Sequence, residues 1–188
     1  MIYCSPETMN INHNEKNTNP NIVQIDDSPD NVLRRICKEV KSAEFGSPEL
    51  LEIISKMKKE AVHDQDGVAI AAPQIGIDKR IFVIAKKAYK GDAKWRPEVF
   101  INPVITDSSK KHKVVHEGCL SVRRVYGCTE RAMNVTVSAY DEYGNKFSYG
   151  AGGLIAHIVQ HEYDHLDGIL FIDHGFDFEE YDHNEGLK

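Results

Sequence analysis

Two histidines and a glutamate near the C-terminal end of the chain have the spacing of a metal site. They stand in the stretch His161-Glu162-Tyr163-Asp164-His165. In a helix, residues four apart lie on one face and are separated by about 6 Å along the axis, so His161 and His165 can bind one metal ion. Glu162 would lie at the edge of that face, within reach of a water molecule on the metal. This HExxH pattern indicates two histidine ligands and a general base.

The pattern fixes only three letters, so an amphipathic helix with solvated His and Glu side chains is the alternative. The helix itself is predicted because Leu154 and Ile158 are apolar and Gly168 can end it. A catalytic metal keeps three protein ligands and one open position, so a third ligand is needed. The downstream residues do not follow the metzincin spacing, since Phe171 stands where a further histidine would be. Upstream, Cys119 is a candidate.

Composition describes an ordinary globular protein. The chain has 188 residues, of which 41% are hydrophobic and 28% are charged, and one domain is expected. A formal net charge of -6 argues against a nucleic-acid partner. The sequence shows neither an apolar run long enough for a membrane span nor the pattern of a secretory signal at its N-terminus. Four cysteines without a CxxC pair suggest reduced thiols, and we expect a cytoplasmic protein.

The elements that must position these residues are predicted to form an α+β fold, with antiparallel strands around the C-terminal HExxH helix. Residues 1–20 are expected to be a flexible Asn-rich tail, 21–176 a single catalytic domain, and 177–188 an acidic tail. A short strand is expected at 22–25, and a helix from Ser47 to about residue 63. Alternation over 134–149 predicts an antiparallel hairpin. Residues 67–76 are predicted to be either a tight loop or an extended edge that lines a groove and offers Gln74.

Three short motifs, in this order, resemble the signatures of the peptide deformylase family. They are GVAIAAPQ at 67–74, EGCLS at 117–121 and QHEYDH at 160–165. The resemblance extends from about residue 22 to about residue 174, and the order and spacing of the motifs make it specific. It implies a single divalent metal ion held by Cys119, His161 and His165, with a water in the fourth position. Fe(2+) is expected, while Zn(2+), Ni(2+) or Co(2+) also suit these ligands.

The family resemblance also implies the reaction and its participants. The reaction is removal of the N-formyl group from the initiator methionine of nascent chains, with release of formate. Glu162 would act as general base. The Gln74 side-chain amide and the Leu120 backbone N–H would stabilise the tetrahedral oxyanion. The substrates are N-formylmethionyl peptides, so transient contact with the ribosome is expected.

Further residues are assigned to the substrate and to support of the ligands. The peptide is expected to add as a strand along the backbone of Val68, Ala69 and Gly118. His157, one helical turn before His161, is predicted to form a wall of the methionine pocket. By resemblance, Glu117 pairs with Arg131 and supports the ligands, the alternative being a surface ion pair.

One position departs from the family pattern. The first motif usually reads GxGxAAxQ, and Ala69 stands at its second glycine. A methyl group there would crowd the substrate, or strain the backbone if the residue needed a positive φ. Two alternatives to an active deformylase therefore stay open. One is a deformylase-like protein that binds without turnover, and the other is a zincin-type endopeptidase suggested by HExxH alone.

Overall fold

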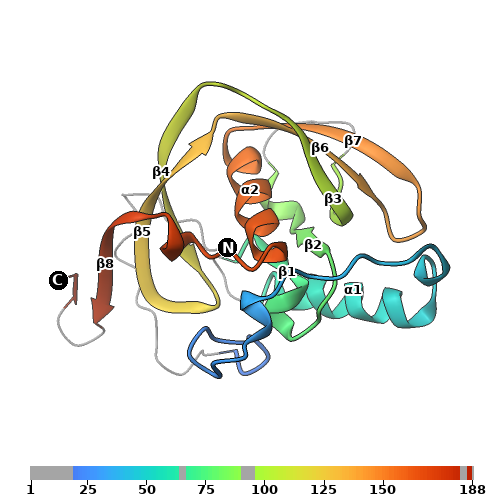
Figure 1. The fold of residues 1–188 in the computed structure, drawn as a ribbon, viewed down its shortest axis with the longest axis horizontal. Helices are drawn as coiled ribbons and strands as arrows, with labels where there is room; N and C mark the ends of the chain where they lie inside the picture. The colour runs from blue at the N-terminus through green and yellow to red at the C-terminus, as the bar shows by residue number, and fades with distance from the viewer. Residues whose placement is uncertain (1–18, 64–66, 90–95, 183–185, 188) are drawn as a thin grey trace.

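The computed structural model describes residues 19–63, 67–89, 96–182 and 186–187 (Figure 1). Two α-helices are present in this part of the chain, α1 (Pro48–Glu60) and α2 (Leu154–Leu166). The strands are β1 (Ala69–Ala71), β2 (Ile81–Ile84), β3 (Val99–Ser108), β4 (His112–Cys119), β5 (Val122–Ala132), β6 (Asn134–Tyr140), β7 (Lys146–Gly152), β8 (Phe176–Asp182) and β9 (Gly186–Leu187). Short 3-10 turns include η2 (Val32–Arg34), η4 (Ala72–Ile75) and η6 (Phe171–Asp173).

The strands form two antiparallel sheets on either side of α2. One sheet has the order β1-β2-β3-β6-β7 and the other the order β4-β5-β8-β9. In Figure 1, α2 lies in the middle of the molecule, with β4, β5 and β8 on the left and β3, β6 and β7 arching over the right. This arrangement confirms the predicted α+β class with antiparallel strands around a C-terminal helix. The predicted hairpin is β6–β7, whose register runs from Asn134 opposite Gly152 to Tyr140 opposite Lys146.

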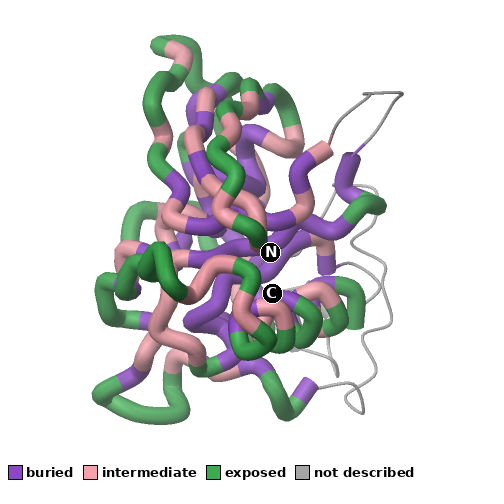
Figure 2. Tube along the Cα trace, turned by 90° about the vertical axis from the view of Figure 1, so that its right-hand side faces the viewer, coloured by how far each residue is buried: buried purple, intermediate pink, exposed green. Residues whose placement is uncertain are grey.

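The largest buried cluster joins α2 to the five-stranded sheet. Ala156, Ile158 and Val159 of α2 are fully buried and belong to the same cluster as Phe82 and Phe100. A second cluster packs α1 on the opposite side of β1 and β2. Figure 2 shows the buried chain passing through the centre of the molecule and the exposed segments around it. Because α2 lies between these layers, His157, His161 and His165 outside this cluster are buried too.

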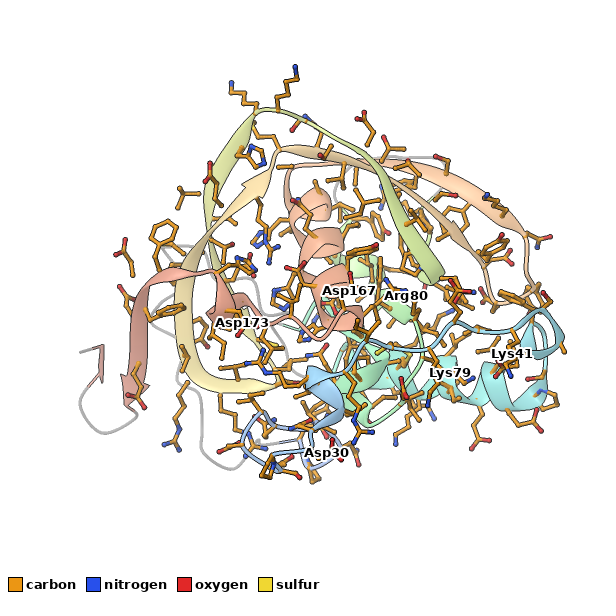
Figure 3. The ribbon with its side chains drawn as sticks, viewed as in Figure 1. Asp30, Lys41, Lys79, Arg80, Asp167 and Asp173 are labelled. Carbon is orange, nitrogen blue, oxygen red and sulfur yellow. The ribbon has the colours of Figure 1, made fainter. Side chains whose placement is uncertain are left out.

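The C-terminal end of α2 is fixed by side chains from distant segments. Arg80 Nη1 lies 2.6 Å from Asp167 Oδ1 and 3.2 Å from the Leu166 carbonyl oxygen, and Figure 3 shows Arg80 and Asp167 side by side at this point. A cation at the last turn also interacts favourably with the helix dipole. On the other side, a Cβ atom on Gly168 would come within 2.8 Å of the Arg34 backbone, so glycine allows the two segments to touch.

Two expectations about the ends of the domain change with the structure. Residues 22–25 do not form a strand but an irregular segment. Residues 177–182, expected to be part of an acidic tail, belong to β8, which pairs with β5 through Val125 opposite Glu180 and Tyr126 opposite Glu179. The predicted N-terminal tail lies outside the described residues, apart from Asn19 and Pro20. None of the helices in the described ranges is both long and apolar enough to cross a membrane.

Candidate metal centre and the groups around it

The two histidines of the HExxH pattern lie one turn apart on α2, in the interior of the protein. His161 and His165 are 2% and 0% exposed, and their rings are 5.0 Å apart. The helix runs from Leu154 to Leu166, as the apolar spacing predicted. The four-residue spacing therefore brings two imidazoles to one buried place, and the alternative of solvated histidines does not apply.

Cys119 reaches the same place from the end of β4. The β4–β5 hairpin has a register shift between Gly118 and Cys119, which leaves Cys119 opposite Val122 at the mouth of a tight turn. Cys119 Sγ lies 3.3 Å from His165 Nε2, and the ligand atoms of Cys119, His161 and His165 all lie within 4.8 Å of one another. The structure thus brings together the three residues assigned as ligands, from a helix and a strand far apart in sequence.

The donor set fits a single divalent transition-metal ion. A sulfur and a nitrogen bound to one tetrahedral ion at about 2.3 and 2.1 Å are about 3.6 Å apart, close to the separation of Cys119 and His165. His161 Nε2 is buried and has no hydrogen-bond partner of good geometry among the described residues, which suits a ligand atom. One thiolate and two imidazoles suit Fe(II), Zn, Ni or Co.

A buried carboxylate orients the first histidine. Glu117 is 0% exposed, and its Oε2 accepts a hydrogen bond from His161 Nδ1 at 2.6 Å. Its Oε1 accepts from Arg131 Nε at 2.7 Å and from the Thr129 hydroxyl. The expected Glu117–Arg131 pair is therefore present and fully buried, not a surface pair. Because the Nδ1 proton of His161 is held by Glu117, its Nε2 is left with a lone pair for a metal.

These contacts set the charges of the cluster. Burial raises the pKa of Glu117, but hydrogen bonds from His157, His161 and Arg131 outweigh it and hold that pKa far below its usual range. Burial lowers the pKa of His161, yet the neighbouring Cys119 and Glu117 raise it to about 9. A metal that binds His161 therefore displaces a proton. Burial, and next the charge of His161, lower the pKa of His165 well below its usual value.

Arg131 extends this network to a residue that the sequence left unassigned. Its Nη1 lies 2.6 Å from Asp164 Oδ2 on α2, and the Asp164 side chain is 21% exposed. Arg131 joins Asp164 to Glu117, so strand β5 and helix α2 are held together by one guanidinium group. Thr129, whose hydroxyl donates to Glu117, is a second residue of this network to which the sequence analysis assigned no role.

His157 lies on the same side of α2 and approaches the same carboxylate. Its Nε2 is 3.0 Å from Glu117 Oε1, and the residue is 4% exposed. Burial lowers its pKa more than the nearby carboxylate raises it. Its assignment to the methionine pocket stays a prediction, and the contact with Glu117 is an additional role that sequence reasoning did not assign.

The residues predicted to be the general base and the oxyanion donors are buried as well. Glu162 is 0% exposed and follows His161 on α2. Gln74, in η4, is equally buried: its Oε1 accepts from the Ala71 N–H at 2.9 Å, and its Nε2 lies 3.5 Å from Cys119 Sγ and 3.3 Å from Ser121 Oγ. The side-chain amide of Gln74 is thereby held in one orientation, with its donor end at the ligand cluster.

The residues assigned to the substrate lie on two strand edges. Ala69 belongs to β1, and Gly118 lies near the end of β4; each of these strands ends its sheet. Val68 precedes β1, and its carbonyl accepts from the Ala85 N–H at 2.8 Å. A Cβ atom on Gly118 would come within 2.6 Å of the Tyr126 ring, so only glycine fits there without a shift.

Ala69 does not carry the strain that a positive φ would bring. Positive φ outside glycine is confined, in the described part of the chain, to Asn102, Arg124 and Asp177. Ala69 is 0% exposed and lies opposite Ile84 in the β1–β2 pair. It belongs to the buried cluster that includes Ala71 and Phe82. Regular strand geometry therefore accommodates the alanine without backbone cost.

Known proteins of one family are similar to most of this chain. The model of the family described as polypeptide deformylase matches residues 20–186. A peptide deformylase of Thermosynechococcus vestitus is 40% identical over 144 residues, which cover 77% of this chain and 73% of that protein. Peptide deformylase 1 of Clostridium perfringens is 37% identical over 145 residues, which cover 77% of this chain and 92% of that protein.

Solved structures give the same result for the fold. An actinonin-bound class I type b peptide deformylase from Acinetobacter baumannii superposes with a TM-score of 0.69 at 34% identity, covering 81% of this chain and 95% of that chain. A Plasmodium falciparum peptide deformylase in complex with an inhibitor gives a TM-score of 0.69 at 35% identity, covering 83% of this chain and 89% of that one.

Proposed function

Because the chain belongs to the polypeptide deformylase family, we propose that it is a metal-dependent hydrolase that removes the N-formyl group from the initiator methionine of newly made proteins. The main observation at the site that supports this function is the position of the three predicted ligands. Cys119, His161 and His165 converge in a buried cluster, with Glu162 on the same helix. A zincin would not place a cysteine among its ligands, so Cys119 distinguishes the two readings of HExxH.

The metal would be held by Cys119, His161 and His165, with Fe(2+) as the expected ion and Zn(2+), Ni(2+) or Co(2+) as substitutes. Such an ion, when bound, lowers the pKa of water and polarises a carbonyl oxygen. Glu117 fixes the ring of His161 through the 2.6 Å hydrogen bond to Nδ1, so this ligand keeps its direction.

Glu162 would move the proton in the reaction. It takes a proton from the attacking water and delivers it to the amine that leaves when the formyl C–N bond breaks. Its complete burial places the carboxylate in a low dielectric, where proton transfer over a short distance is favoured over exchange with solvent.

The negative charge that develops on the formyl oxygen needs hydrogen-bond donors. The Gln74 side-chain amide and the Leu120 backbone N–H are the proposed donors. Gln74 is prepared for this role because its Oε1 is already bound to the Ala71 N–H and only its donor end faces the cluster. Loss of one such donor slows hydrolases by about 10²–10³-fold, so Gln74→Ala is expected to slow the reaction by that factor.

The substrate would enter between the two sheets. Strands β1 and β4 are both edge strands, so each can be extended by an added strand. The peptide would bind the backbone of Val68, Ala69 and Gly118, with its methionine side chain near His157. N-formylmethionyl peptides exist on nascent chains, so we further propose a cytoplasmic location and transient contact with the ribosome, without a nucleic-acid site on this chain.

Formate release from a formyl-Met peptide tests the function. Protein loaded anaerobically with Fe(II) is expected to release formate, and Glu162→Ala is expected to bind the metal but lose turnover. Release of formate at equal rates by both proteins would refute the assigned base. A wild-type protein with one equivalent of metal and no turnover would refute the enzyme, and Ala69→Gly would then show whether the alanine is responsible.

Cys119→Ala distinguishes a deformylase from an endopeptidase. In a deformylase the substitution removes a ligand, and metal binding is expected to be lost. In an endopeptidase that uses HExxH with a downstream ligand, metal content and cleavage of an internal peptide bond would survive.

A further inference from the structure

The irregular segment 22–25 touches both loops that face the ligand cluster. The Val23 N–H donates to the Gln74 carbonyl at 2.8 Å, and the Ile25 N–H donates to the Ser121 carbonyl at 3.0 Å. Gln74 lies in η4, and Ser121 lies in the turn between β4 and β5. The segment thus joins two parts of the site that are separated by more than forty residues in sequence. None of its residues contributes a ligand or a base.

Gln24, between these two backbone contacts, has its side chain inside the protein. The residue is 4% exposed, and its Nε2 donates to the Leu120 carbonyl at 3.0 Å and to the Ile22 carbonyl at 3.2 Å. Both protons of the side-chain amide therefore have acceptors. A buried amide with satisfied donors is specific in its geometry, since any other position would leave polar groups without partners.

The backbone of Gln24 is fixed as firmly as its side chain. Its N–H donates to Asp27 Oδ2 at 2.7 Å, and its carbonyl accepts a hydrogen bond from Asn31 Nδ2. Asn31 in turn caps η2, since its Oδ1 accepts from the Leu33 N–H at 3.0 Å. The loop from 22 to 31 is closed on itself, so Gln24 presents its amide from a rigid base.

The Leu120 carbonyl belongs to the same peptide group as the Ser121 N–H. That N–H lies 3.4 Å from Cys119 Sγ and donates to it. A hydrogen bond received by a carbonyl polarises the peptide and strengthens the bond that its N–H donates. Gln24, the Leu120–Ser121 peptide and the Cys119 sulfur thus form one chain of hydrogen bonds that ends on a ligand atom.

We infer that Gln24 is a positioning residue for the active site. It fixes the Leu120–Ser121 peptide, which aims the Ser121 N–H at the Cys119 sulfur and holds the neighbouring Leu120 N–H where the substrate oxyanion forms. The effect on turnover rests on the proposed function, whereas the effect on the sulfur does not. N–H donors around a thiolate lower the energy of its electrons, so Gln24 tunes the ligand as well as the oxyanion donor.

Gln24→Met tests this role, because methionine keeps the length and the burial but has no donor. With Fe(II), we expect kcat to fall about tenfold while KM changes less than about twofold, since the ordered oxyanion donor acts in the transition state. With Co(II), we expect the thiolate-to-cobalt charge-transfer band to move to longer wavelength, because the Ser121 N–H bond to sulfur is weaker.

Leu50→Ala is the matched control. Leu50 is buried in the first turn of α1, and its apolar side chain is not a member of the hydrogen-bond chain, so its truncation lowers stability without removing one of those hydrogen bonds. We expect normal kcat and an unshifted band in this variant. Gln24→Met with kcat within twofold of wild type and an unshifted band would overturn the proposal. If the wild-type protein releases no formate, the proposed function fails. The shift of the thiolate-to-cobalt band in Gln24→Met still tests whether Gln24 positions the peptide that donates to the Cys119 sulfur.

A second variant serves if Gln24→Met does not fold. Gln24→Asn keeps the amide but is one methylene shorter, and the backbone held by Asp27 and Asn31 cannot move to compensate. The same band shift, with a smaller fall in kcat, is expected. A band and a kcat equal to those of wild type in Gln24→Asn would refute the positioning role, because an amide that misses the Leu120 carbonyl would then suffice.

Discussion

Helices α1 and α2 have the same length of 13 residues but are stabilised in different ways. Helix α1 begins with Ser47 as N-cap, Pro48 at the first position and Glu49 in the first turn, and it buries only apolar residues. Helix α2 begins at Leu154 with Gly153 as N-cap, without a side-chain cap and without an acidic residue in its first turn. The first helix is encoded locally, whereas the second depends on its surroundings.

The buried residues explain this difference. Four polar or charged side chains of α2 are buried, namely His157, His161, Glu162 and His165. Such groups cost free energy unless they have partners. His157 and His161 contact Glu117 of β4, and His165 Nε2 lies 3.3 Å from Cys119 Sγ. Chemistry at α2 therefore requires a network of polar contacts around it, while α1 needs only an apolar surface to pack on.

The largest effect on stability and metal affinity is expected when Glu117, the carboxylate at the centre of the network around α2, loses its charge. Glu117→Gln leaves Arg131 buried with only Asp164 as an anionic partner, and breaking a buried pair costs about 3–5 kcal/mol. Metal affinity should also fall about 10–100-fold, because the His161 ring loses its anionic partner. Denaturant unfolding and metal titration measure the two effects.

The control for Glu117→Gln is the same chemical change in a partly exposed ion pair. Glu44 pairs with Lys79, and their side chains are 33% and 25% exposed. Glu44→Gln is expected to change stability by about 0–1 kcal/mol and to leave metal affinity unchanged. Equal losses of stability in the two variants would show that burial does not make the network around α2 more stabilising than a partly exposed ion pair.

An apolar truncation in α1 should affect stability alone. Leu50 is 2% exposed, and Leu50→Ala removes three carbon atoms from the second buried cluster, at a cost of about 3 kcal/mol. Helix α1 supplies no polar group to the ligand cluster, so kcat and metal content should stay at the wild-type level. A fall in kcat at a temperature where the variant is fully folded would contradict the separation between the two helices.

The difference between α1 and α2 also explains which parts of the structure could be predicted from the sequence. Helix α1 follows from Ser47, Pro48 and its apolar spacing, and the structure begins it where these residues place it. Helix α2 and its histidines follow from periodicity and the HExxH spacing. These signals are local, and each is complete within about sixteen residues.

Contacts that depend on the register between distant segments were not predictable. Thr129 and Asp164 belong to no sequence motif that predicts their place in the network around the buried guanidinium group of Arg131. Gln24 stood in an apolar run that predicted a strand, but no local pattern tells where its amide points. Strand β8 did leave a signal, since Phe176 and Phe178 alternate with acidic residues, yet the overall polarity of 177–188 outweighed it.

A smaller effect is expected at the start of α2, where the backbone alone is responsible. Gly153 has φ 57° and ψ −131°, a conformation that side chains with a Cβ rarely adopt. A Cβ atom there would meet nothing within 4 Å, so no clash contributes. Gly153→Ala is therefore expected to cost about 1–3 kcal/mol through backbone strain, measured by denaturant unfolding.

Gly150 provides the comparison for Gly153. It lies in β7, has open space at its Cβ position and does not have a positive φ. Gly150→Ala should change stability little or increase it slightly, because alanine reduces the entropy of the unfolded chain. If both substitutions had the same effect, the entry into α2 would not depend on the conformation that glycine permits.

The smallest effect is expected at the cap of α1. The Ser47 hydroxyl accepts a hydrogen bond from the Leu50 N–H at 3.2 Å, and Ser47→Ala should cost about 1 kcal/mol, measured as a shift of the unfolding midpoint. Ser47→Asp restores an acceptor and adds a charge that the helix dipole favours, so it should recover the loss. Neither variant should change metal affinity. A cap effect on metal binding would mean that α1, despite its apolar contacts, is coupled to the ligands that α2 carries.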